Sequence, residues 1–113
     1  MDAMKYEGFV RGAFSLKSRN MINRGEDPAH LAEADLWNLN DLKRVKVGTA
    51  YALEIYSAEI REALSGSDLY ETVSADLENL LDQAISAPSL SAISNIIDQV
   101  KVYQSKYIKF AWQ

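Results

Sequence analysis

Apolar residues recur at intervals of three and four along most of the chain, which is the spacing of one face of an α-helix. The stripe is clear in the first segment, residues 2–22, where it consists of Tyr6, Phe9, Val10, Ala13 and Leu16. No alternation of apolar and polar residues lasts long enough to build a sheet. The pattern therefore predicts an all-α fold.

The second segment begins with a strong helix start and then runs for an unusual length. Asp27 can accept backbone N–H groups and Pro28 suits the first helical position. The apolar rhythm then continues to Leu64, and one helix over 28–64 would be about 55 Å long at 1.5 Å per residue. Gly48, flanked by β-branched residues, is the weak point. We expect either a break near Gly48 or one long helix that pairs with another chain.

The last part of the chain predicts a helical hairpin. Gly66 ends one helix, Ser67 or Asp68 caps the next, and Pro88 separates amphipathic segments at 69–85 and 89–111. Because the connection is short, these two segments should lie antiparallel. The whole reading is an antiparallel helical bundle of four helices, or five if Gly48 interrupts the second, forming a single domain over residues 1–113.

Composition narrows the protein class. The chain has 113 residues, no cysteine and a formal net charge of −4. A disulfide framework and cysteine-bound metal are excluded, and no signal peptide or membrane span is visible. These features favour a cytoplasmic protein without membrane contact. An acidic chain also argues against a dedicated duplex-DNA binder, so nucleic acid is not the favoured partner.

Charge is uneven along the chain. Residues 42–53 carry +3 and residues 54–82 carry −7. Neighbouring helices, or two protomers, could complement each other in this way. The alternative is that each helix has its own solvated charged face.

One pair of residues suggests catalysis. Arg24 precedes the single histidine, His30, by six positions. This spacing resembles the Arg-x(4–6)-His motif of the HEPN-type helical ribonucleases. The resemblance implies that Arg24 would stabilise a phosphate and His30 would transfer a proton. The seven residues differ from the family pattern because glycine follows the arginine. The alternative interpretation is that these seven residues form a helix-capping loop with an exposed histidine.

Other chemistry is weakly supported. A di-iron bundle needs Glu-x-x-His pairs on two helices, and this chain has none. It also lacks a glycine-rich phosphate loop. We therefore expect no metal and no cofactor.

Aromatic residues point to a partner surface. Large rings gather in the second segment and near the C-terminus, and tryptophan is frequent at interface hot spots. The predicted interface residues are Trp37, Tyr103, Tyr107, Phe110 and Trp112. The favoured function is thus a non-enzymatic helical interaction or assembly module, homodimeric or bound to another helical protein. Two alternatives stay open: an RNA-binding or HEPN-like ribonuclease bundle, and a small-molecule sensor whose pocket is lined by Tyr51, Tyr56 and Tyr103.

Overall fold

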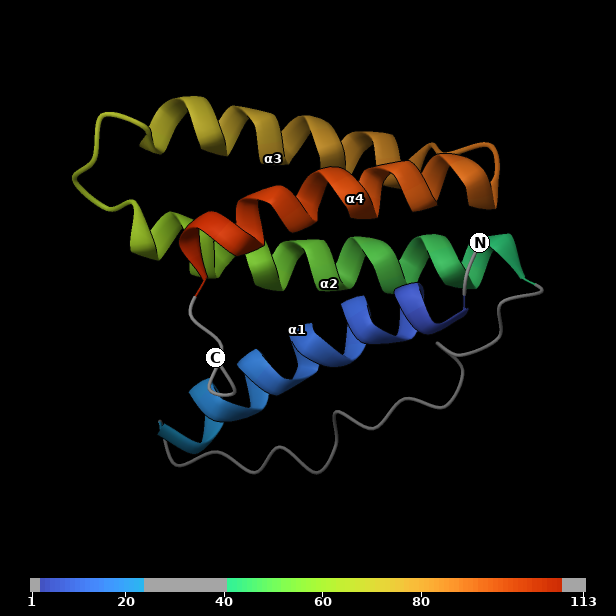
Figure 1. Ribbon diagram of the computed structural model, residues 1–113, viewed down its shortest axis with the longest axis horizontal. Coiled ribbons are helices and arrows are strands. Elements are labelled where there is room, and N and C mark those ends of the chain that lie inside the picture. Colours follow the sequence, from blue (N-terminus) through green and yellow to red (C-terminus); the bar gives the residue numbers. More distant parts are fainter. Residues whose placement is uncertain (1–2, 24–40, 109–113) are drawn as a thin grey trace.

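Residues 3–23 and 41–108 form four helices around one core. The computed structural model describes residues 3–23 and 41–108, with the side chains of the first range described from Met4 to Leu16. The helices are α1 (Ala3–Asn23), α2 (Leu42–Ala63), α3 (Tyr70–Ile85) and α4 (Leu90–Tyr107) (Figure 1). These ranges contain no strand. The predicted all-α class is confirmed for them.

Helix α2 lies at the centre and contacts each of the other three helices. In Figure 1, α1 and α2 both run from the right of the view to its left, α3 returns, and α4 runs left again. Helix α3 therefore opposes α2 and α4, whereas α1 follows the direction of α2. An antiparallel arrangement of the whole bundle is not confirmed.

The predicted apolar stripes form the core. In α1, all five stripe residues from Tyr6 to Leu16 are buried. The stripes of the other helices meet them, with burial of Val45, Leu53, Tyr56, Ile60, Val73, Leu77, Leu80, Ala84, Ile93, Ile97 and Val100. Burying side chains of this kind contributes roughly 1.5–3 kcal/mol each relative to exposure, which makes these stripes the main stabilising feature.

The second helix corrects the prediction for 28–64. Asp41 has extended backbone angles (φ −111°, ψ 102°), and its Oδ1 accepts the backbone N–H of Lys43 at 3.0 Å and of Arg44 at 3.4 Å. This is an N-cap, so a single helix over 28–64 is wrong. The expected break at Gly48 is wrong too, because Gly48 is buried inside the continuous α2. Asp27 and Pro28 lie outside the described residues.

The hairpin follows the predicted segments 69–85 and 89–111 closely except at its start and its end. Helix α3 begins at Tyr70 with Leu69 as its N-cap and no side-chain capping bond, so the predicted cap at Ser67 or Asp68 is wrong. Gly66 adopts a φ of 81° after α2, and the Ser89 hydroxyl accepts the N–H of Ala92 at 3.2 Å to cap α4. Positive φ favours glycine, which explains why the chain turns there. Helix α4 ends at Tyr107 because Ile108 is extended (φ −108°, ψ 129°), so the predicted helix over 89–111 was too long.

Candidate functional site

The residues predicted to do chemistry fall outside the described part of the chain. Arg24 and His30 lie between α1 and α2, in residues 24–40. Trp37 lies in the same segment, and Phe110 and Trp112 follow α4. The structure therefore leaves these five residues as predictions.

The three tyrosines expected to line one pocket have separate surroundings. Tyr56 is buried, its hydroxyl donates to the carbonyl oxygen of Phe9 at 2.5 Å, and the two rings lie 5.0 Å apart. Burial raises the pKa of Tyr56. The ring of Tyr51 meets that of Phe14 edge-on at 5.7 Å. Tyr56 thus joins α2 to α1 as part of the core rather than facing a ligand.

The third of these tyrosines, Tyr103, belongs to the α3–α4 hairpin. Its hydroxyl donates to Oδ2 of Asp76 at 2.9 Å, and its ring stacks on Tyr107 with centroids 6.5 Å apart. Desolvation raises the pKa of Tyr103, and the bond to Asp76 raises it further. Tyr103 and Tyr107 are the two predicted interface residues that the structure describes. Both are half-buried.

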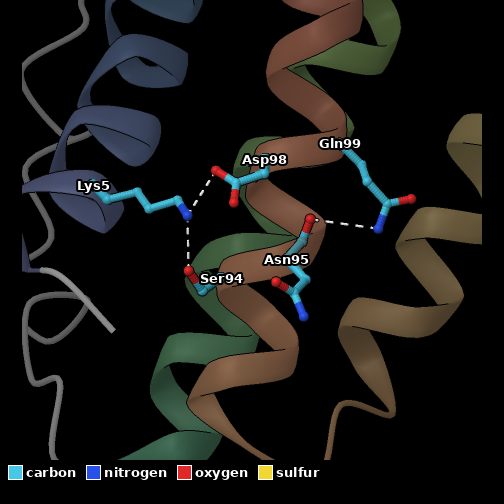
Figure 2. Close-up of polar contacts among 5 residues, drawn as sticks. All are labelled: Lys5, Ser94, Asn95, Asp98 and Gln99. Carbon is cyan, nitrogen blue, oxygen red and sulfur yellow. Dashed lines mark hydrogen bonds and ion pairs between the residues drawn. The ribbon is translucent and has the colours of Figure 1, made fainter.

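A serine and a lysine also meet, between α1 and α4. Nζ of Lys5 lies 2.8 Å from the Ser94 hydroxyl and 2.6 Å from Oδ1 of Asp98 (Figure 2). A serine nucleophile needs a neighbouring base. Here Lys5 pairs with Asp98 as a cation, so the arrangement is an ion pair and a hydrogen bond. Its role is to hold α1 against α4.

A shallow polar hollow lies over the turn between α3 and α4. It has a volume of about 370 Å³, and its lining is Gln83, Ser86, Ala87, Pro88, Ala92, Asn95, Ile96 and Gln99. Figure 2 shows Asn95 and Gln99 on α4, with the Gln99 amide donating to the Asn95 carbonyl oxygen at 3.4 Å. Its three amide side chains are exposed to water, and none of the described residues that line it is charged. The hollow therefore offers no anchor for a particular ligand.

A more apolar hollow lies beside the start of α2 and the end of α3. Figure 1 shows these two helix ends next to each other at its right. Its volume is about 490 Å³, and its lining is Lys43, Lys46, Val47, Ala50, Tyr51, Glu54 and Ile85. Val47 is 57% exposed and Ile85 is 56% exposed, although both are large apolar residues. A concave apolar surface with charged residues at its edge is typical of a protein contact.

Sequence reasoning missed this hollow. Val47 lies off the core stripe of Val45, Thr49 and Leu53, and Ile85 directly follows the buried Ala84. Both positions should be polar on a solvated helix face. Apolar β-branched residues off the stripe were the signal that could have found it.

Comparisons of the chain with protein-family models, with curated proteins and with solved structures find no match. Helices long and apolar enough to cross a membrane do not occur within residues 3–23 and 41–108. In the same ranges, no three acidic or histidine side chains gather in a way that could hold a metal ion.

Proposed function

We propose that this chain is a non-enzymatic helical assembly module that binds a second copy of itself. The observation that carries the proposal is the apolar hollow between α2 and α3, with Val47 and Ile85 more than half exposed beside Tyr51. Leaving such side chains in water forgoes roughly 25 cal/mol for each Å² of apolar area that a partner would cover. A cytoplasmic setting belongs to the same proposal, since a chain without cysteine does not depend on an oxidising compartment.

The polar contacts of the described residues support a structural rather than a catalytic role. Lys5, Ser94 and Asp98 hold α1 to α4, and Tyr103 with Asp76 holds α4 to α3. Each of these groups is engaged by another part of the same chain. None of them lines the apolar hollow, whose described lining residues belong to α2 apart from Ile85 of α3.

The aromatic set predicted from the sequence is a competing surface for the same role. It comprises Trp37, Tyr103, Tyr107, Phe110 and Trp112. The hydroxyl of Tyr103 is already bonded to Asp76 within the chain. We therefore assign the self-association contact to the α2–α3 surface rather than to the aromatic set. Substitution of Val47 on α2 or of Val102, which is 53% exposed on α4, distinguishes the two surfaces.

Light scattering coupled to size-exclusion chromatography tests the proposal. The monomer mass is 12.7 kDa, and we expect a species of about twice that mass that dissociates on dilution. A strict monomer at millimolar concentration would overturn the proposal. The ribonuclease hypothesis is tested separately with RNA at low salt, where phosphate contacts are strongest. Cleavage lost in His30→Ala would support it, and absence of binding would remove it.

A further inference from the structure

We propose that the second copy packs against the α2–α3 face in antiparallel orientation, so that the basic start of α2 in each copy meets the acidic turn between α2 and α3 of the other. This inference rests on the proposed self-association and specifies its surface and its orientation. It concerns two regions at opposite ends of the helix pair. We call them the basic end (Lys43, Lys46, Val47 and Ile85) and the acidic end (Glu62, Asp68, Leu69, Tyr70 and Glu71).

Both ends carry exposed apolar side chains. Val47 and Ile85 are more than half exposed at the basic end, and Leu69 (49%) and Tyr70 (39%) are exposed at the acidic end. Figure 1 shows the start of α2 and the end of α3 at the right and the α2–α3 turn at the left. Two apolar patches of similar exposure therefore lie about one helix length apart.

Helix geometry places the two patches on one face. From Tyr70 to Ile85 is fifteen residues, which at about 100° each leaves them roughly 60° apart around α3. On α2, Val47 and Arg61 are fourteen residues apart and fall within about 40° of each other. Arg61 pairs with Glu78 of α3 at 3.6 Å, and Val47 shares the hollow with Ile85. The outer edge of α2 and that of α3 thus form a continuous face from one patch to the other.

The charges at the two ends are opposite. At the basic end, Lys43 (exposed) and Lys46 (half-buried) outnumber the exposed Glu54 in the lining of the hollow, whereas Glu62, Asp68 and Glu71 are all exposed at the acidic end. The three cations Lys43, Arg44 and Lys46 sit in the first turns of α2, where the helix dipole disfavours positive charge. The Arg44 side chain is paired with Asp41 at 3.3 Å, whereas within residues 3–23 and 41–108 no acidic side chain forms an ion pair with Lys43 or Lys46. An acidic partner would offset that unfavourable placement.

Orientation follows from these charges. In a parallel pair, the acidic end of one copy would face the acidic end of the other, and like charges at close range oppose association. In an antiparallel pair related by a two-fold axis, each basic end meets an acidic end. The same contact then occurs twice, and the assembly closes at two copies. Charge complementarity therefore favours the antiparallel dimer.

Cross-linking distinguishes the orientations, because the chain contains no cysteine of its own. Val47→Cys and Leu69→Cys chains would be prepared separately, mixed, and treated with a short bismaleimide, with Val102→Cys as the control on α4. Val102 is 53% exposed, close to the value for Val47. We expect the mixture to yield mainly Val47–Leu69 cross-links between chains. Each variant alone should yield several-fold less product.

Charge reversal gives an independent readout in the full chain. Lys43→Glu with Lys46→Glu, or Asp68→Lys with Glu71→Lys, should each weaken the dimer by about tenfold or more, because each change acts at both copies of the contact. An equimolar mixture of the two double variants should regain near wild-type affinity. Glutamate in the first turns of α2 favours the helix, so the first variant should remain folded, as circular dichroism would show.

Each outcome separates the two proposals. A chain that stays monomeric in every assay overturns the proposed function and this inference together. A dimer in which Val47→Cys cross-links mainly to Val47→Cys, or whose affinity neither charge reversal changes, is consistent with the proposed function but overturns the antiparallel α2–α3 contact. A dimer that cross-links only through Val102 moves the interface to α4 and also overturns it.

Discussion

Removing the hydroxyl group of Tyr56 is a sharp test of how α1 is held to α2. The side chain is almost fully buried, its ring packs on Phe9, and its hydroxyl donates to the Phe9 carbonyl oxygen at 2.5 Å. Tyr56→Phe keeps the ring and removes that one bond. Tyr56→Ala removes the ring as well.

The two substitutions should differ several-fold in cost. A buried hydrogen bond contributes about 1 kcal/mol net. The Phe9 carbonyl lies inside α1 and keeps its helical partner in the phenylalanine variant, so no extra penalty for an unsatisfied acceptor applies. Tyr56→Phe should therefore lower the free energy of unfolding by about 1 kcal/mol. Tyr56→Ala leaves a cavity in the core and should cost about 4 kcal/mol.

Urea denaturation followed by circular dichroism measures both. At a slope of about 1.5 kcal/mol per molar urea, Tyr56→Phe should move the midpoint down by about 0.7 M. Tyr70→Phe is the matched control, because Tyr70 is 39% exposed; at concentrations low enough to keep the chain monomeric it should change the free energy of unfolding by less than about 0.5 kcal/mol. If Tyr56→Phe and Tyr70→Phe are indistinguishable, the hydrogen bond to Phe9 does not stabilise the fold and the reasoning is wrong.

Three further predictions concern local features. Gly8→Ala should raise the free energy of unfolding by about 0.5–1 kcal/mol, because Gly8 is helical and exposed and an added Cβ meets nothing within 4 Å. A lower free energy of unfolding in urea denaturation would contradict this. Asp41→Ala should lower the free energy of unfolding by about 1 kcal/mol, because it removes the N-cap of α2. Asp41→Asn should lower it much less, since asparagine also caps helices. Equal decreases for the two variants would exclude capping as the role of Asp41. Burial raises the pKa of Tyr6 from 10 to about 12 and also raises that of Tyr56. The folded chain then keeps protons that the unfolded chain releases above pH 10, so the free energy of unfolding should be highest below pH 10 and fall between pH 10 and 12. Tyr6→Phe should make this decrease with pH less steep. An unchanged dependence of stability on pH would refute the role of Tyr6.

The sequence predicted the helices well where the apolar stripe was regular. The stripe of α1 and the turns near Gly66 and Pro88 follow from spacing and turn residues, which depend on neighbouring residues only. Gly48 was misread because a glycine costs a helix only about 1 kcal/mol, and the buried neighbours Val45 and Thr49 hold α2 together across it. The helix start at Asp41 was missed because the apolar rhythm runs through it without a change.

The direction of α1 and the candidate surface could not be read from spacing. Whether α1 follows or opposes α2 depends on where the chain between them ends, and periodicity carries no information on that. Val47 and Ile85 are thirty-eight positions apart, and they share a hollow only because α3 folds back along α2. The sequence marked each as an apolar residue off its stripe, and only the packing of the two helices brings them together.

The central claim is self-association through the α2–α3 face, and sedimentation equilibrium on three chains tests it most directly. Wild type, Val47→Glu and Val102→Glu would be compared at the same concentrations, since the two valines have nearly equal exposure on different helices. We expect wild type and Val102→Glu to dimerise with similar affinity, and Val47→Glu to be at least about tenfold weaker, because it places a charge in an apolar contact. A dimer that survives Val47→Glu and is lost in Val102→Glu would contradict the account.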